Sequence, residues 1–194
     1  VEQRDALRAK AGETTPHLLV MTATPIPRTL AMAAYADLDV SAIDELPPGR
    51  TPVQTVALSA ERRPELVERI RAACAEGRQA YWVCTLIDDS DEVVAQAAQT
   101  TYEALSASLP ELRVALVHGR MKAADKQATM RRFKEGEADL LVATTVIEVG
   151  VDVPNASLMI IENAERLGLA QLHQLRGRVG RGATASSCVL MYQP

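Results

Sequence analysis

The sequence predicts an α/β fold, in which a mainly parallel sheet has helices on both faces. Short runs of apolar residues recur along the chain, separated by longer stretches rich in helix-forming residues. Apolar runs without polar alternation are typical of strands buried on both faces, and hence of parallel sheets. The chain has 194 residues and is 47% hydrophobic but only 3% aromatic, so its core should be mainly aliphatic.

The first part of the chain, residues 1–43, carries three expected elements before a linker, the first of them a polar helix over VEQRDALRAKA (1–11). HLLVMT (17–22) is a short apolar run of buried-strand type. PRTLAMAAYA (27–36) begins with proline, which suits a first helical position, and continues with good helix formers. DELPPGRTP (44–52) contains three prolines and a glycine and is the strongest linker signal in the sequence. We therefore expect a separate domain over 53–194.

From residue 53 onward, strands and helices should alternate. Strands are expected at the apolar runs 53–58, 79–87, 113–119, 139–145, 157–162 and 186–192. Helices are expected over 61–77, 92–109, 122–136 and 169–178, where helix-forming and charged residues predominate. The first and third of these helical stretches end at Gly77 and Gly136, and glycine commonly follows the last turn of a helix.

Composition limits the classes of function. The net charge is −4 at pH 7, so any contact with nucleic acid must be local. The three cysteines are scattered without a C-x-x-C pair, which favours reduced thiols in the cytoplasm over disulfides or a zinc site. No apolar run reaches the roughly 18 residues that a membrane span needs. We expect a cytoplasmic chain with no membrane partner and no metal site of its own.

Polar and basic residues gather in the loops of the predicted sheet. HGRM (118–121) and TTVIEVGVDVPNA (144–156) end two of the strands, and RGRVGRG (176–182) follows the last helix. Threonine hydroxyls, backbone amides beside glycine and arginine side chains are the groups that hold phosphates. Ligands of parallel α/β sheets lie outside the carboxyl ends of the strands. We therefore expect these loops to share one phosphate-binding edge.

Three stretches of the sequence resemble motifs of the superfamily 2 helicases. QLRGRVGR (174–181) matches their motif VI, Q-x-x-G-R-x-G-R, while ATTVIEVGVDVP (143–154) resembles motif V and TATPIPRT (22–29) resembles motif III. The resemblance runs along the whole chain, with the motifs in order. It implies that 53–194 form the second RecA-like motor domain, of the P-loop NTPase type. Residues 1–43 would be a tail of the first motor domain and 44–52 the linker between the two.

The resemblance also implies an activity. The helicases of this superfamily that the chain resembles most are ATP-dependent translocases on double-stranded DNA, which remodel stalled replication forks and branched recombination junctions during repair. The partners would be branched or duplex DNA and the first motor domain. ATP and Mg²⁺ would be the cofactors, but the sequence contains neither the Walker A pattern G-x-x-x-x-G-K-[ST] nor an acidic Mg²⁺ box. We therefore expect the chain to be inactive by itself.

By resemblance, motif VI reaches ATP held on the first motor domain. Arg181 would be the arginine finger, Arg178 its partner on the phosphates, and Gln174 would help order the site. The alternative is a solvated basic helix end, favourable to the helix dipole. The interleaved glycines favour the phosphate role, because they have no evident structural use at a helix end. Arg176 would be solvated or paired with a carboxylate.

The other motifs imply further site residues. Gly150 and Asp152 would lie near the ribose or the coupling interface, and Thr144 and Thr145 on the DNA backbone; ordinary strand-end capping is the alternative. Thr22 and Thr24 would couple hydrolysis to DNA grip, cap the following helix, or do both. His118, Gly119 and Arg120 resemble a motif that contacts the tracked DNA strand, although His118 could be structural. Trp82 could pack in the core or stack on a base.

Two other classes of function are compatible with such a fold. One is a non-enzymatic module that docks nucleic acid or protein. The other is a Rossmann-type enzyme, which we set aside because the sequence has no G-x-G-x-x-G followed by an acidic residue about 20 positions later.

Overall fold

The computed structural model describes residues 52–85, 90–144, 153–182 and 184–194, together with Leu19, Met21, Ser41, Ile43 and Glu45. The chain divides into two compact units, Val1–Val40 and Ser41–Pro194. Of the first unit only Leu19 and Met21 are described, and both are exposed. The helices expected over 1–11 and 27–36 and most of the strand expected over 17–22 lie outside the described residues. The division into 1–43, 44–52 and 53–194 stays a prediction.

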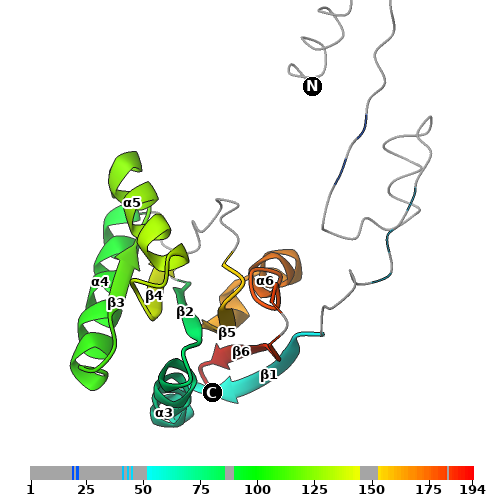
Figure 1. The fold of residues 1–194 in the computed structure, drawn as a ribbon, viewed down its shortest axis with the longest axis horizontal. Coiled ribbons are helices and arrows are strands. Elements are labelled where there is room, and N and C mark those ends of the chain that lie inside the picture. Colours follow the sequence, from blue (N-terminus) through cyan, green and yellow to red (C-terminus); the bar gives the residue numbers. More distant parts are fainter. Residues whose placement is uncertain are drawn as a thin grey trace, which may run out of the picture. The chain divides into compact units, whose positions relative to one another are not determined.

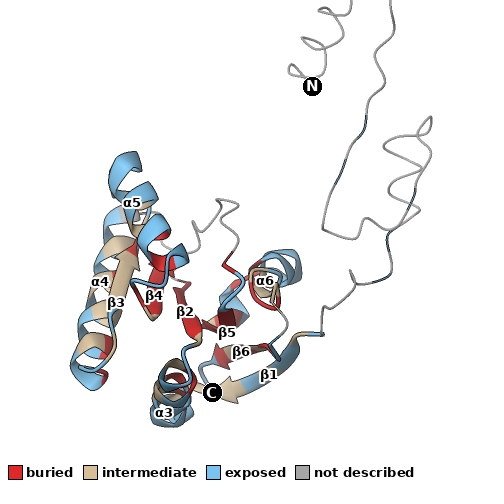
Figure 2. Ribbon diagram, viewed as in Figure 1, coloured by how far each residue is buried: buried red, intermediate tan, exposed pale blue. Residues whose placement is uncertain are grey.

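The second unit contains a six-stranded sheet in which every pairing is parallel. Its strands are β1 (Gln54–Ser59), β2 (Gln79–Cys84), β3 (Val114–Val117), β4 (Leu140–Thr144), β5 (Ala156–Ile161) and β6 (Ser187–Tyr192). They lie in the order β1-β6-β5-β2-β4-β3 (Figure 1). The central strands β2, β4 and β5 are buried along their whole length (Figure 2). The predicted fold class is therefore confirmed.

Helices cover both faces of this sheet. The longer helices are α3 (Arg63–Ala75), α4 (Asp91–Ser108), α5 (Ala123–Lys134) and α6 (Leu169–Arg176), and the short 3-10 helices are η1 (Ala60–Arg62) and η2 (Ala164–Arg166). Successive strand residues point to opposite faces, so each face has its own apolar cluster. One cluster contains buried residues of α3 and α4 and the other those of α5 and α6.

The largest aromatic side chains belong to this core. Trp82 in β2 is 0% exposed, which confirms the core interpretation, and the Arg63 guanidinium lies 4.8 Å from its ring centroid. On the other face, the rings of Tyr81 and Phe133 meet edge to face at 5.0 Å. The amide of Gln79 donates to the carbonyl oxygens of Phe133 and Ala138 at 2.5 and 2.8 Å, and these bonds hold the end of α5 against β2.

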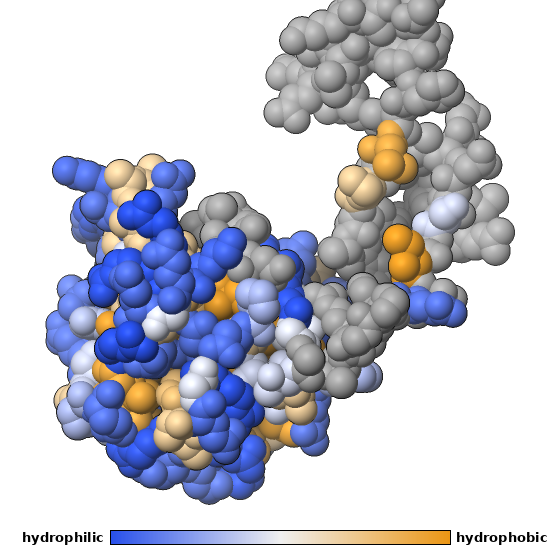
Figure 3. Space-filling model, in the orientation of Figure 1, coloured by the Kyte–Doolittle hydropathy of each residue, from blue (hydrophilic) through white to orange (hydrophobic). Residues whose placement is uncertain are grey.

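The face seen in Figure 3 is mostly hydrophilic, with small scattered apolar areas. In the part of the chain that the structure describes, no helix could cross a membrane and no cluster of His, Cys, Asp or Glu could hold a metal ion.

The cysteines should be unreactive in the folded chain. Burial raises the pKa of the Cys84 thiol to about 12 and that of Cys188 to about 11, so almost no thiolate forms near neutral pH. We expect both to resist iodoacetamide at about pH 8 and to react fully once the chain is denatured. Mass spectrometry of labelled peptides would measure this, and rapid labelling of either thiol in the native chain would contradict it.

Candidate nucleotide and nucleic-acid sites

Helix α6 and the turn after it carry the motif VI residues, and the buried side of the helix sets their orientation. Leu175 is buried and Leu172 packs against the same core, so this side of the helix faces the sheet. Gln174 is exposed on another side. At the start of the helix, the Oε1 atom of Gln171 accepts a hydrogen bond from the backbone N–H of Gly168 at 3.1 Å. This bond satisfies one of the amide groups that a helix start leaves without a partner.

The turn after α6 depends on two glycines. Gly180 has a φ of +76°, in the left-handed region that favours glycine. A Cβ atom added at Gly182 would lie 2.5 Å from the carbonyl oxygen of Pro154, so only glycine fits there without a shift of backbone. Val179, directly before Gly180, is buried. The expectation that the interleaved glycines have no structural use is therefore wrong for this pair, because they shape the turn that presents the arginines.

The three arginines of this turn differ in their surroundings. Arg176 donates from Nη2 to Nδ1 of His173 at 3.1 Å. Arg181 is half-buried, and its Nε donates to the carbonyl oxygen of Gly177 at 3.2 Å, which sets the direction of its side chain. Arg178 is also half-buried, and among the described residues no carboxylate lies within ion-pair distance of it. A half-buried guanidinium that no carboxylate neutralises favours an anion from outside the domain.

A second group of predicted residues follows the carboxyl end of β3. His118, Gly119 and Arg120 form a turn that is closed by a hydrogen bond from the Met121 N–H to the His118 carbonyl oxygen at 3.2 Å. The Nζ atom of Lys126 donates to the carbonyl oxygen of Gly119 at 3.0 Å and links the turn to α5. This turn therefore has fixed geometry at the edge of the sheet.

The His118 ring is poorly placed to carry charge. Burial, and then the positive charges of Arg120 and Lys126, lower its pKa below the usual value, so the ring is neutral near pH 7. Its Nδ1 atom is buried and has no hydrogen-bond partner among the described residues. His118 can thus offer a neutral ring to a ligand, while the charge at this turn belongs to Arg120.

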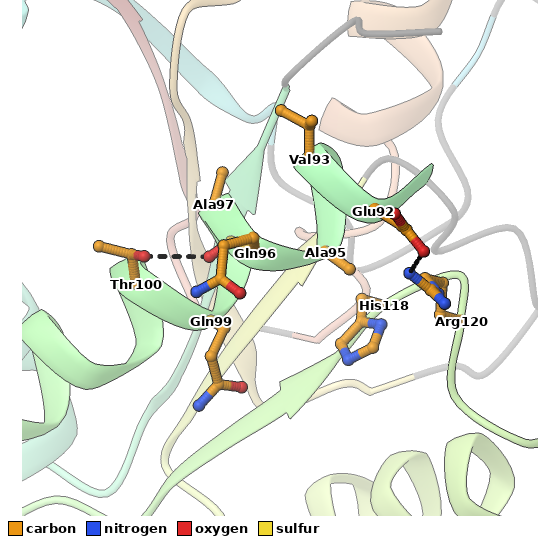
Figure 4. A pocket seen from close by; sticks show the side chains of 9 residues that line it. All are labelled: Glu92, Val93, Ala95, Gln96, Ala97, Gln99, Thr100, His118 and Arg120. Atoms are coloured by element: carbon orange, nitrogen blue, oxygen red, sulfur yellow. Dashed lines mark hydrogen bonds and ion pairs between the residues drawn. The ribbon is translucent and has the colours of Figure 1, made fainter. Parts of the chain in front are cut away.

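An open pocket of about 770 Å³ lies between this turn and the first half of α4 (Figure 4). Glu92 at the start of α4 points toward Arg120, and its Oε1 atom pairs with Nη1 of Arg120 at 2.7 Å. The Arg120 and Glu92 side chains are 50% and 74% exposed, so solvent reaches both.

The remaining predicted site residues are less accessible or undescribed. Thr144, at the carboxyl end of β4, is 1% exposed, and its hydroxyl has no partner within the described ranges. Its burial leaves no hydroxyl surface for a DNA backbone in this structure. Thr22, Thr24, Thr145, Gly150 and Asp152 lie outside the described residues.

The sequence had led us to expect that the two described groups share one edge of the sheet. In the structure they lie at different edges. His118, Gly119 and Arg120 follow the carboxyl end of β3. Arg181 precedes the amino end of β6, and the neighbouring Gly182 lies against Pro154, just before β5. Because all strands are parallel, these places are opposite edges of the sheet. The expectation failed because motif VI follows a helix, and a helix of a parallel fold returns the chain to the amino ends of the strands.

One polar cluster escaped the sequence analysis. Glu162, at the carboxyl end of β5, is 11% exposed in its side chain and pairs with Arg63 of α3. The Thr85 hydroxyl donates to the backbone carbonyl oxygens of Glu162 and Asn163, the latter at 2.9 Å, and Gln193 donates to the Asn163 side chain at 3.0 Å. Asn163 itself has a φ of 47°. An acidic residue directly after an apolar run was a signal, but its partner is distant in sequence.

This cluster fixes the corner at which the chain leaves β5 for η2 and α6. It borders a pocket of about 450 Å³ between the start of α3 and α4, lined in part by Arg63, Thr100, Glu162 and Gln193. The hydrogen bonds and the ion pair satisfy the polar groups of this corner from within the domain. We therefore attribute to it a structural role in setting the start of the segment that carries motif VI.

The donors at the end of α6 suit a phosphate group and do not suit a metal. Arginine side chains and the Gln174 amide offer N–H groups to phosphate oxygens. Among the described residues, no acidic side chain pairs with Arg178, and no group of His, Cys, Asp or Glu could hold a metal ion.

The chain is similar to helicases both in sequence and in structure. The model of the helicase conserved C-terminal domain family matches residues 62–183. ATP-dependent DNA helicases RecG from Escherichia coli K12 and Haemophilus influenzae are 70% and 69% identical to the whole chain, which spans 28% of each. A structure of RecG bound to a three-way DNA junction matches with a TM-score of 0.74 and 49% identity, over 89% of this chain and 22% of that one.

A more distant neighbour shares the fold alone. Saccharomyces cerevisiae Dbp5, in a structure bound to RNA and ADP BeF3, has a TM-score of 0.59 at 16% identity, over 88% of this chain and 44% of that chain.

Proposed function

Since the chain belongs to the helicase conserved C-terminal domain family, we propose that it is the second motor domain of an ATP-dependent double-stranded DNA helicase of the RecG kind. Its 70% identity to RecG helicases over the whole chain supports this proposal. The parent enzyme would remodel stalled forks and branched recombination junctions in DNA repair. Its partners would be branched or duplex DNA and the first motor domain, and it would act in the cytoplasm.

The observation that carries the proposal is the arginine pair at the end of α6. Arg178 and Arg181 are half-buried beside a turn that Gly180 and Gly182 shape, and Arg178 has no carboxylate partner in the described part of the chain. ATP bound to the first motor domain would supply the phosphoryl group that is transferred to water. Its transition state spreads negative charge over the γ-phosphoryl oxygens.

Each residue of motif VI has a proposed task. Arg181 would donate to the oxygens on which charge develops, and its bond to the Gly177 carbonyl would hold the side chain in a reactive direction. Arg178 would bind the phosphates in both the ground and transition states. Gln174, exposed one turn before Arg178, would help to order the site. Gly150 and Asp152 would approach the ribose or the interface between the motor domains, and Thr22, Thr24 and Thr145 would contribute to coupling and DNA contact.

The isolated 194-residue chain should not hydrolyse ATP. The Walker A lysine and the Mg²⁺ ligands are not in its sequence, and motif VI can supply only donors for the phosphates. A coupled assay with and without branched DNA should give turnover at the level of the blank. Full-length enzyme in the same buffer is the positive control, and DNA-stimulated turnover by the chain alone would contradict the proposal.

Arg120 should contribute one phosphate contact in the intact helicase. Each such contact adds about one unit to the slope of log K against log salt concentration, so Arg120→Ala should lower the slope by about one. Binding to a branched DNA would be measured between about 50 and 200 mM salt. Arg69→Ala, which removes an equal charge from an exposed position on α3, is the matched control. An unchanged slope in Arg120→Ala would remove this residue from the DNA contacts.

A further inference from the structure

The arginine proposed for DNA contact is paired with a carboxylate within the domain. The Nη1 atom of Arg120 lies 2.7 Å from Oε1 of Glu92, across the pocket between β3 and α4 (Figure 4). Glu92 belongs to the first turn of α4, where its backbone N–H donates to the Oγ atom of Ser90 at 3.3 Å. The helix start thus fixes the position from which the carboxylate reaches Arg120.

The sequence around Glu92 is strongly acidic. DDSDE (88–92) places four carboxylates within five residues, and one of them, Glu92, pairs with Arg120. A carboxylate and a phosphate offer similar pairs of anionic oxygens to a guanidinium group. Glu92 and a DNA phosphate would therefore compete for the same donor.

The exchange of one anion for the other would cost little. Both side chains are at least half exposed, and ion pairs at such positions contribute little to stability because solvent screens the charges. Glu92 is therefore strong enough to lower the affinity of Arg120 for phosphate a few-fold, yet too weak to prevent binding. A translocase must release and rebind the backbone at every step, so a contact that is easily broken suits this task.

From these observations we infer that Glu92 is an intramolecular competitor of the DNA phosphate for Arg120. It holds the guanidinium when DNA is released and gives it up when DNA binds. The inference rests on the proposed function, because it requires Arg120 to contact DNA. Beyond that function, we infer that the acidic start of α4 sets the strength of the Arg120 contact and so limits the affinity for DNA.

The test is a double-mutant cycle in the intact helicase. Glu92→Gln keeps the size of the side chain and removes its charge, and should tighten binding to a branched DNA by about threefold at low salt. The gain should shrink as salt screens the pair. Glu103→Gln is the matched control, because Glu103 is an exposed carboxylate on the same helix, bonded to Gln99 and outside the pocket.

The Arg120→Ala background separates the possible results. If Glu92 acts through Arg120, Glu92→Gln should have no effect on affinity once Arg120 is alanine. An equal gain in both backgrounds, or an equal gain from Glu103→Gln, would mean general repulsion of DNA by acidic residues and would overturn the inference. No gain from Glu92→Gln, with Arg120→Ala still weakening binding, would overturn the inference alone. An Arg120→Ala variant with unchanged affinity and salt slope would instead refute the DNA contact of the proposed function.

Discussion

Replacing Arg181 with alanine in the intact helicase should lower ATP turnover by on the order of a thousandfold, which is the effect of losing an arginine finger at other phosphoryl-transfer sites. The affinity for nucleotide should change much less, because the interaction strengthens as charge develops in the transition state. Folding should survive, since the side chain lies at the end of α6 and its described hydrogen bond goes to a nearby backbone carbonyl. Turnover, nucleotide Kd and thermal midpoint would be measured on the same preparation.

Arg176→Ala is the control for this prediction. Arg176 is the last residue of α6, has the same charge as Arg181 and donates to His173, so its loss should have a mild effect on turnover. Arg178→Ala should weaken nucleotide binding as well as turnover if Arg178 binds the phosphates in both states. Near-normal turnover in Arg181→Ala, with folding intact, would show that the finger is assigned to the wrong arginine.

Replacing Phe133 with alanine should lower the free energy of unfolding of the second unit by about 3–5 kcal/mol. Phe133 is fully buried, meets Tyr81 edge to face and fixes the end of α5 against β2. Loss of the ring removes this contact and leaves a cavity that close-packed neighbours can only partly fill. Since whole domains are stable by only about 5–15 kcal/mol, this loss is a large fraction of the total.

Urea denaturation of the 194-residue chain would measure this change through the fluorescence of Trp82. Trp82 is the only tryptophan and is fully buried in β2, so its signal reports the second unit alone. Phe133→Leu keeps most of the apolar volume and should cost clearly less than the alanine variant. A loss below about 1 kcal/mol in Phe133→Ala would show that the site collapses and that α5 does not depend on this ring.

Most of the fold of the second unit could be predicted from the sequence because its signals are local. Strands buried on both faces appear as unbroken apolar runs, and Gly77 and Gly136 take positive φ values after α3 and α5, as expected of terminating glycines. The order β1-β6-β5-β2-β4-β3 was not predictable. It depends on which faces pack together, and apolar runs of similar composition do not specify their neighbours.

The sites were predictable only in part. The motifs identified Arg178, Arg181 and Arg120 as exceptional, but their surroundings depend on contacts that are distant in sequence. Glu92 and Arg120 come from different elements, and Arg63 and Glu162 are 99 residues apart. The burial of Thr144 was not predictable either, since a threonine at a strand end can be buried as easily as exposed.

The contact between Gly182 and Pro154 has a mechanical consequence. The two backbones already touch so closely that no side-chain atom fits between them, and atoms in contact cannot approach further. Any shift of the chain entering β5 toward the turn must therefore displace the turn by a similar amount. Residues 145–152 join the carboxyl end of β4 to this same point. Movement of the chain entering β5 would thus reach Arg181 as a displacement of the backbone that carries it.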